Sequence, residues 1–220
     1  MQTHPATSQA DWFVFQRWAQ YEGEIRASRL RIACIAAFYL IHLWRYVAAT
    51  GVLPAGSFLQ ISDPAGVSDR FHLLASLLAL AWIFVSANVM LVLHHRVFPP
   101  WLPWITTGLD SLFLTSLICI SAGPRSPLVV GYFLLIALSG LRFSLPLVRC
   151  ATLTSVAGYL VVLGRAKWPA RFGQPEDVDL TVPRYQQVMI VLALVITGVL
   201  IGQILRRVRT FVLARESLVP

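Results

Sequence analysis

Apolar residues along this chain form long continuous blocks, separated by charged residues, proline or glycine. About 20 apolar residues suffice to cross the ~30 Å hydrocarbon core of a bilayer as a helix. The blocks are continuously apolar, not alternating, which favours helices over a β-barrel. The blocks are residues 30–49, 72–93, 101–122, 128–141, 145–163 and 187–205. We therefore predict an all-α fold, a polytopic membrane bundle of six transmembrane helices.

The fourth block is shorter than the others. At ~1.5 Å per residue, residues 128–141 cover only ~21 Å as a helix. We expect flanking residues such as Ser126 and Phe143 to complete the crossing.

Aromatic residues recur every third position near the N-terminus, at Trp12, Phe15 and Trp18. Glu22 and Arg26 follow with the i,i+4 spacing of a helical ion pair. This pattern predicts a short amphipathic helix whose aromatic stripe lies at the inner membrane surface. A juxtamembrane helix packed in an oligomer is the alternative.

The helical pattern of the sixth block continues past the membrane, from Tyr185 to about Glu216. A helix of that length measures ~48 Å, well beyond a ~30 Å core. We predict three regions: a cytoplasmic segment with the interfacial helix (1–29), the six-helix domain (30–205) and a cytoplasmic helical extension or linker (206–220). A basic stop-transfer tail is the simpler interpretation of the last region.

The composition is typical of a protein whose surface faces lipid, since 57% of residues are hydrophobic, 13% are charged and the mean hydropathy is +0.69. The net charge of +8 is distributed by topology. More arginines and lysines lie on the side of both termini than on the other side, and the positive-inside rule makes that side cytoplasmic. The charge therefore orients helices, and nucleic acid is not an expected partner.

Three ionisable residues lie inside predicted spans, where such groups are costly and often functional. His42 and Arg45 share a face of the first helix, and Asp110 is near the middle of the third. We hypothesise an ion pair between Asp110 and Arg45 inside the bundle. A structural pair and a ligand or proton site both remain open.

No metal site is predicted. The loop acids Glu176, Asp177 and Asp179 are more typical of a solvated cluster than of a cation site. His42 and His72 would permit a bis-histidine haem in the outer leaflet, but no second histidine pair accompanies them, so haem is not expected. The cysteines lack CxxC spacing and are expected to be apolar fillers: Cys34, Cys119 and Cys150.

The third and fourth blocks carry a specific pattern: LDSLFLT at 109–115, AGPRSPL at 122–128 and YFLL at 132–135. Over about residues 30–210 this resembles the six-helix membrane sensor modules of bacterial histidine kinases, and more loosely the membrane anchors of class III nucleotide cyclases. The resemblance implies a homodimeric sensor or receptor of a two-component system in the bacterial inner (plasma) membrane. It also implies a cytoplasmic signalling domain, on a longer protein or a separate partner.

Redox-sensing members of that group carry a GGxxNPF segment between these two helices, implicated in quinone binding. Gly123 and Pro127 match it, while Ala122, Ser126 and Leu128 replace its first glycine, asparagine and phenylalanine. A quinone is therefore the one cofactor that the resemblance allows. Read from its residues, the segment predicts either a pocket wall, with Gly123, Arg125, Ser126 and Pro127 as ligand-binding candidates, or a tight interhelical turn.

Gly198 and Gly202 form a GxxxG motif on the sixth helix, which suits dimerisation, although packing within the chain is an equal alternative. No catalytic motif is present, so we do not expect an enzyme. The leading hypothesis is a membrane input module that passes a membrane-soluble or bilayer cue down the sixth helix. A small transporter or embedded enzyme, or a purely structural anchor or dimerisation unit, is the alternative.

Overall fold

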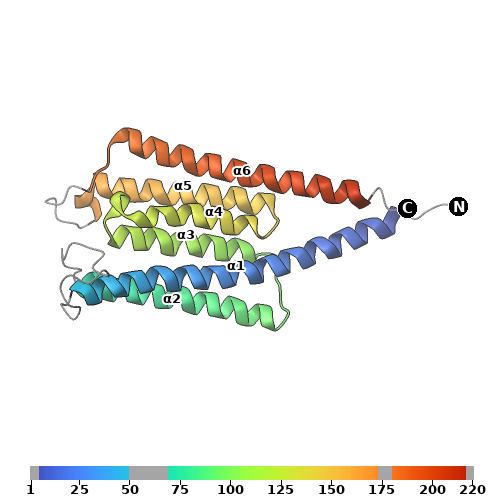
Figure 1. Ribbon diagram of the computed structural model, residues 1–220, viewed down its shortest axis with the longest axis horizontal. Coiled ribbons are helices and arrows are strands. Elements are labelled where there is room, and N and C mark those ends of the chain that lie inside the picture. Colours follow the sequence, from blue (N-terminus) through green and yellow to red (C-terminus); the bar gives the residue numbers. More distant parts are fainter. Residues whose placement is uncertain (1–4, 50–68, 173–179, 217–220) are drawn as a thin grey trace.

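The computed structural model describes residues 5–49, 69–172 and 180–216, and these ranges contain helices and turns but no strand. Figure 1 shows long helices lying side by side along one axis. The α-helices are α1 (Pro5–Ala49), α2 (Asp69–His94), α3 (Leu102–Ile120), α4 (Val130–Gly140), α5 (Leu145–Lys167) and α6 (Arg184–Glu216). Short 3₁₀ segments are η1 (Gly123–Arg125), η2 (Pro127–Val129) and η3 (Pro169–Phe172). The all-α prediction is confirmed.

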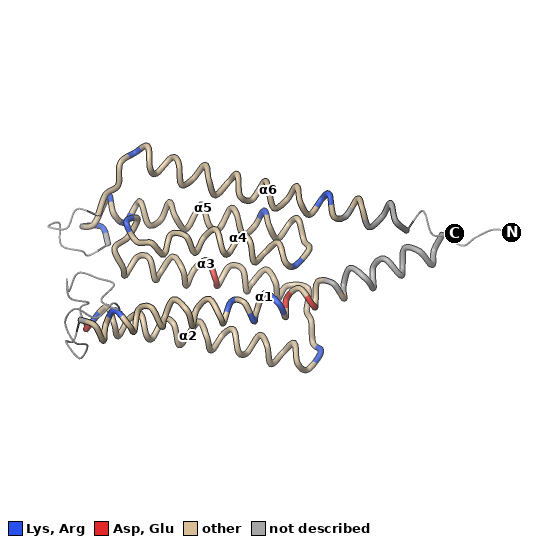
Figure 2. Tube along the Cα trace, in the orientation of Figure 1, with Lys and Arg blue, Asp and Glu red and all other residues tan. Residues whose placement is uncertain are grey.

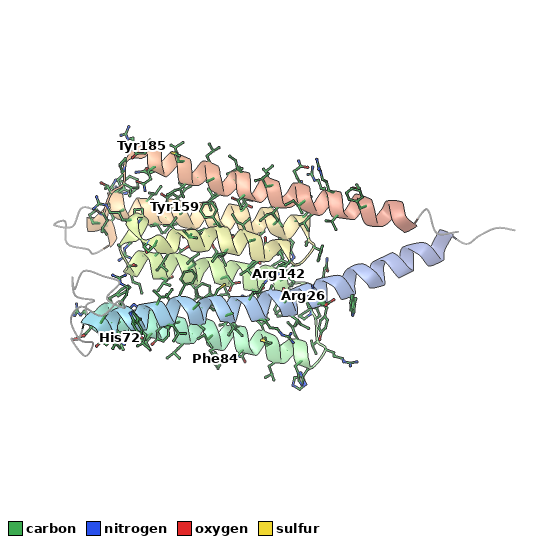
Figure 3. All side chains as sticks on the ribbon, in the orientation of Figure 1. Arg26, His72, Phe84, Arg142, Tyr159 and Tyr185 are labelled. Atoms are coloured by element: carbon green, nitrogen blue, oxygen red, sulfur yellow. The ribbon has the colours of Figure 1, made fainter. Side chains whose placement is uncertain are left out.

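Five helical segments among the described residues are long and apolar enough to cross a membrane: Gln20–Ala48, Asp69–His94, Leu102–Ile120, Leu145–Lys167 and Arg184–Val208. Their outward faces carry large apolar side chains such as Phe84, which is 70% exposed (Figure 3). Charged residues gather toward the ends of the helices, with a few midway (Figure 2). This is the pattern of a multi-pass membrane protein, which hides apolar surface in lipid.

The fourth predicted span is the exception. Its α-helix, α4, has 11 residues, and with the preceding 3₁₀ turn the apolar helix runs only from Pro127 to Gly140. Ser126 lies just before this helix, where its side chain accepts a hydrogen bond from the Leu128 amide at 3.3 Å. The helix is too short to count as a span by length alone, although it lies along α5 and α6.

The predicted N-terminal interfacial helix is wrong as a separate element. The structure has one 45-residue helix, α1, that runs from Pro5 through the predicted boundary at residues 29 and 30. The predicted ion pair between Glu22 and Arg26 is confirmed, and it lies on the exposed side of this helix. No proline or glycine breaker separates the two predicted helices near residue 29, so the backbone continues without a turn.

The long sixth helix is confirmed, since α6 runs from Arg184 to Glu216 with its apolar window ending at Val208. The division at residue 205 therefore falls inside one helix. Figure 1 shows that the N-terminal end of α1 and the C-terminal end of α6 extend beyond the other helices at the same end of the bundle.

The helices pack as two groups. α1 and α2 form a hairpin, while α5 packs on α3, α4 and α6; the main core between them also takes in Ile35 of α1 and Trp82 of α2. Tyr132, Ile136, Tyr159 and Leu194 are fully buried there. The Tyr132 hydroxyl lies 2.8 Å from that of Thr115, so α3 and α4 are joined by a polar contact inside the apolar core.

Two predicted hairpin turns are confirmed, one between α2 and α3 and one between α4 and α5. Arg96 and Phe143 adopt positive φ angles of 58° and 50° in these turns. Prolines occupy the first turns of α3 and α5, where a missing amide hydrogen costs nothing. Most of the predicted loop at 50–70, and the acidic cluster of Glu176, Asp177 and Asp179, lie outside the described residues.

The GxxxG motif is used inside the chain. A Cβ atom on Gly198 would clash with the side chain of Thr152 on α5, and one on Gly202 would lie 3.1 Å from the Leu145 side chain. Both glycines are buried. These contacts agree with the alternative, close packing of α6 on α5, while dimerisation through Gly198 and Gly202 stays a prediction.

Candidate functional site

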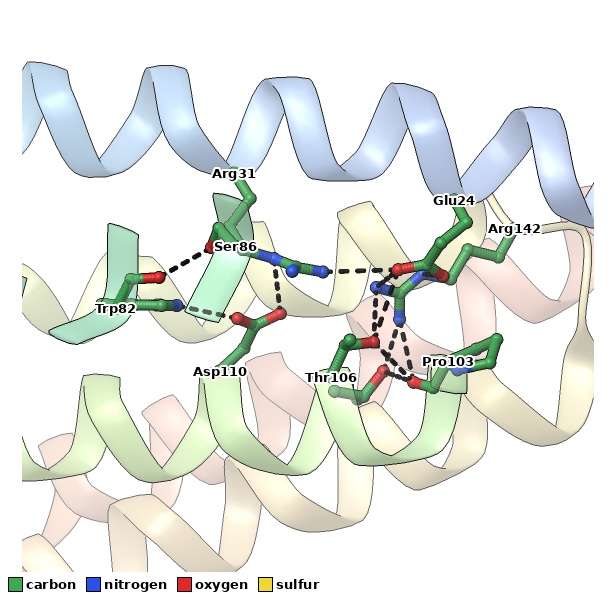
Figure 4. Close-up of polar contacts among 9 residues, drawn as sticks. Glu24, Arg31, Trp82, Ser86, Pro103, Thr106, Asp110 and Arg142 are labelled. Carbon is green, nitrogen blue, oxygen red and sulfur yellow. Dashed lines mark hydrogen bonds and ion pairs between the residues drawn. The ribbon is translucent and has the colours of Figure 1, made fainter. Parts of the chain in front are cut away.

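Four charged side chains are buried together between the α1–α2 hairpin and the rest of the bundle (Figure 4). Glu24 and Arg31 come from α1, Asp110 comes from α3, and Arg142 comes from the turn between α4 and α5. None of the four is more than 5% exposed. Because Glu24 and Arg31 are seven residues apart on one helix, they face the same side.

Positive and negative groups alternate along this cluster. Arg31 Nε lies 2.9 Å from Asp110 Oδ2, and Arg31 Nη2 lies 3.6 Å from Glu24 Oε1. Trp82 on α2 donates its indole hydrogen to Asp110 Oδ1 at 2.8 Å. Three helices therefore meet at the Asp110 carboxylate.

Arg142 forms the other end of the cluster. Its Nε lies 2.7 Å from Glu24 Oε2, and its Nη2 donates to Glu24 Oε1 at 2.9 Å, so the guanidinium holds the carboxylate with two contacts. It also donates to the hydroxyls of Thr106 and Thr107 and to the Pro103 carbonyl. This fixes the α4–α5 turn to the first turns of α3 and to α1.

The cluster carries two positive and two negative groups, each with an opposite charge in contact. Pairing of this kind lowers the cost of ionisable groups at membrane depth. The predicted partner of Asp110 is wrong, since Arg31 takes the place of Arg45. Arg31 and Arg142 are both buried and therefore do not belong to the exposed charges at the ends of the helices.

A pocket of about 330 Å³ lies between the hairpin and helices α3 and α4, on the other side of Arg31 from Glu24 and Arg142. Each surrounding helix contributes residues at helical spacing. The pocket is mostly apolar, and its walls come from Ile35, Phe38 and His42 on α1, Ala75, Ala79 and Trp82 on α2, Leu114 and Leu117 on α3, and Gly131 and Leu135 on α4. Clefts of this size and character commonly hold small ligands.

The pocket brings together residues that the sequence selected separately. His42, Arg45, Ser126 and Pro127 all lie in its wall. Ser126 and Ser121 approach each other at 3.3 Å there. Asp110 does not line the pocket but contacts two residues that do, Arg31 and Trp82.

Gly123 and Arg125 lie in η1, outside the pocket wall. Gly123 is buried with a φ of 59°, a conformation that glycine adopts easily, and its nearest side chain is Leu180. Arg125 donates from Nε and Nη2 to the Thr181 carbonyl at 3.2 and 2.9 Å. The segment from which the resemblance implies quinone binding therefore divides, with only its second half at the pocket.

His42 and His72 face each other at the end of the pocket away from Arg142. Their rings stack 5.3 Å apart, with His42 Nε2 3.2 Å from His72 Nδ1. The Tyr46 ring also stacks on His72, with the ring centroids 3.8 Å apart. Figure 3 shows His72 and Arg142 toward opposite ends of the bundle. Two nitrogens in direct contact leave no room for an iron between them, so this pair does not fit axial ligation of haem.

No group of three or more potential ligand residues is positioned to hold a metal ion in the described part of the chain. Cys34, Cys119 and Cys150 are free and half-buried. Cys34 lies in the pocket wall as one of its small side chains.

Sequence reasoning missed Glu24, Arg31, Trp82 and Arg142 as parts of one site. Glu24 lay in the segment taken as cytoplasmic (1–29) and Arg31 in the first predicted span (30–49), so their seven-residue spacing on one buried face was not considered. The continuation of the helical pattern through residue 29 was the available signal.

Comparison with known proteins finds no family model, no curated protein and no solved structure that matches this chain.

Proposed function

We propose that this chain is the membrane input module of a signal-transduction protein. It senses a membrane-soluble or bilayer cue and couples it to a cytoplasmic output domain, on the same protein or on a partner. The observation that carries the proposal is a pocket whose wall shares Arg31 and Trp82 with the buried ion-pair cluster. An event in the pocket thereby reaches the contact between α1 and the α4–α5 turn.

The proposed topology has six crossings with both termini in the cytoplasm of a bacterial cell. The ends of α1 and α6 extend at the same end of the bundle, which supports an even number of crossings (Figure 1). With five long segments, the sixth crossing is α4, although Pro127–Gly140 spans only ~21 Å. Such a helix is accommodated by local thinning of the bilayer. The excess of arginine and lysine near the termini supports their cytoplasmic location.

The route of the signal follows from the contacts of Arg31. This side chain faces the pocket and holds Asp110 and Glu24. A ligand that moves Arg31 or Trp82 changes the balance of contacts at Glu24, which holds Arg142 in the α4–α5 turn. That turn packs against Gly23, near the point where α1 leaves the bundle. Movement of α1 relative to α6 is then the output, in the manner of a bistable packed element.

The test joins the module, after Glu216, to the catalytic part of a histidine kinase whose output is measured in cell membranes. We expect output to change when the pocket is filled by Ala79→Phe, because phenylalanine adds volume beside Trp82. The matched control is Leu80→Phe on the lipid-facing side of the same helix, where the side chain is 63% exposed. The control should leave output unchanged.

Constant output in all variants and under changes of lipid composition would refute sensing and leave a structural anchor. A change with Leu80→Phe as large as with Ala79→Phe would show that the helix surface, not the pocket, governs output.

A further inference from the structure

The pocket has an electrostatic asymmetry along α1. Its wall includes the stripe Arg31, Ile35, Phe38, His42 and Arg45, which recurs every three or four residues and so follows one face of the helix. The stripe is ~21 Å long at 1.5 Å per residue. It therefore forms a long apolar wall with an arginine at each end.

The two arginines differ in their partners. Arg31 is buried and neutralised by Asp110 and Glu24. Arg45 is exposed, and no acidic partner for it is found among the described residues. Among the described residues no aspartate or glutamate lines the pocket, so the end of the pocket at Arg45 has a net positive character.

We propose that the pocket binds a single-chain anionic amphiphile, with a carboxylate or phosphate head at Arg45 and its chain along α1 toward Trp82. His42, one turn from Arg45, provides a second polar contact for the head group. The apolar walls from α2, α3 and α4 cover the chain. A volume of about 330 Å³ lies at the small end of the range for ligand pockets, which favours a ligand with one chain over a phospholipid with two. The inference deepens the proposed function by naming the ligand class of the same pocket.

The charge of Arg45 is what selects an anion. An arginine contacts a carboxylate or phosphate through two parallel hydrogen bonds, which are stronger than hydrogen bonds between neutral groups. A fatty alcohol with the same chain fills the same apolar walls but gains no such contact. Among competitors of equal chain length, the charge of the head group should therefore determine which one binds more tightly.

The test uses the full chain in nanodiscs of neutral phosphatidylcholine. A palmitate analogue with a photoreactive diazirine in mid-chain is the probe, and mass spectrometry locates the labelled residues. We expect labelling in the pocket walls, near Leu78 and Leu135, and competition by unlabelled palmitate and hexadecyl phosphate. Hexadecanol should compete about tenfold less well. A difference between palmitate and hexadecyl phosphate identifies the preferred head group.

Arg45→Ala should lower labelling of the pocket by about tenfold. Arg45→Lys keeps the charge but not the paired hydrogen bonds, so its labelling should fall between that of Arg45→Ala and that of the wild-type protein. The matched control is Arg70→Ala, which removes an exposed arginine at the same end of the bundle and should leave labelling unchanged. Competition in the wild-type protein needs no variant, so the inference is testable even if a substitution impairs folding.

Equal competition by hexadecanol and palmitate, or displacement by a neutral prenylated quinone but not by palmitate, would overturn the inference. Labelling spread over lipid-facing residues such as Leu80 would do the same. The readout is independent of signalling. Pocket labelling with constant kinase output would keep the ligand site and refute sensing, whereas responsive output without selective labelling would keep sensing and refute this ligand.

Discussion

Asp110 accepts contacts from Arg31 and Trp82 at a position that solvent does not reach. In Asp110→Ala the Arg31 guanidinium keeps only its 3.6 Å contact with Glu24, and the Trp82 indole loses its acceptor. Leaving a buried charge without its partner is strongly destabilising. We expect the free energy of unfolding to fall by about 3 kcal/mol, measured by denaturant titration in detergent micelles.

Asp69→Ala is the matched control, because Asp69 is an exposed acid at the start of α2. Its effect should stay within about 0.5 kcal/mol. The double variant Asp110→Leu/Arg31→Met removes both charges and should be more stable than Asp110→Ala, since no unpaired charge remains. A double variant no more stable than the single one would show that the ion pair does not govern stability here.

Candidate residues were visible in the sequence because polar side chains stand out in apolar blocks. His42, Arg45 and Ser126 were selected separately from the sequence, and the structure places all three in one pocket wall. The partner of Asp110 was not predictable in the same way. Arg31 and Arg45 are 14 residues apart, nearly four helical turns, so they share a face and only depth distinguishes them. The depth of each arginine in the bundle depends on how far α1 continues toward the N-terminus, and the first predicted span began only at residue 30.

The packing of α1 on the α4–α5 turn depends on Gly23. A Cβ atom there would clash with the Leu141 carbonyl oxygen and lie 3.0 Å from Arg142 Cα, both of which are backbone atoms that cannot rotate away. We expect Gly23→Ala to displace α1, weaken the Glu24–Arg142 ion pair and lower the free energy of unfolding by about 2 kcal/mol. Denaturant titration in detergent micelles measures this change.

Gly108→Ala is the matched control, since a Cβ atom at Gly108 on α3 meets nothing within 4 Å. Alanine is favoured over glycine inside a helix by ~1 kcal/mol, so this variant should be unchanged or more stable. Equal destabilisation by the two substitutions would mean that helix propensity, and not contact with the turn, governs the effect.

The packing of α6 on α5 gives a second prediction for helices. Gly198→Ala should lower the free energy of unfolding by about 1 kcal/mol, because the new methyl group meets Thr152. Adding Thr152→Ala should recover most of that loss, while light scattering in nanodiscs should show no change of oligomeric state. A changed oligomeric state with unchanged stability would restore the dimer interpretation of Gly198 and Gly202.

The location of each long helix was easier to predict than whether two neighbouring helical segments form one continuous helix. Apolar blocks located all the long helices, and proline marked the start of α3 and α5. The N-terminal segment was misjudged because aromatic periodicity, which is typical of interfacial helices, is equally compatible with the first turns of a longer helix. The lack of a proline or glycine near residue 29 is the local feature that favours the longer helix. The GxxxG motif has the same ambiguity, since close approach serves a neighbour in the same chain as well as a second copy.

At the scale of the whole molecule, the number of times the chain crosses the membrane depends on whether α4, the shortest α-helix, crosses it. Because the extended ends of α1 and α6 lie at one end of the bundle, the five long segments alone cannot account for the path (Figure 1). If α4 crosses, the α4–α5 turn lies on the same side as the α2–α3 turn, and η3 lies opposite. If α4 does not cross, the α4–α5 turn and η3 exchange sides. One exposed residue in each of these three places is enough to decide.

The last prediction uses single cysteines in a protein whose three native cysteines are replaced by alanine. The positions are His95 in the α2–α3 turn, Phe143 in the α4–α5 turn and Trp168 before η3, all exposed. In intact bacterial cells a membrane-impermeant maleimide should label only Trp168→Cys, and His95→Cys and Phe143→Cys should react after the membrane is opened. Labelling of Phe143→Cys but not Trp168→Cys in intact cells would instead make α4 a re-entrant helix. The ends of α1 and α6 would then lie on opposite sides of the membrane, and the route proposed from the pocket to a shared cytoplasmic output would fail.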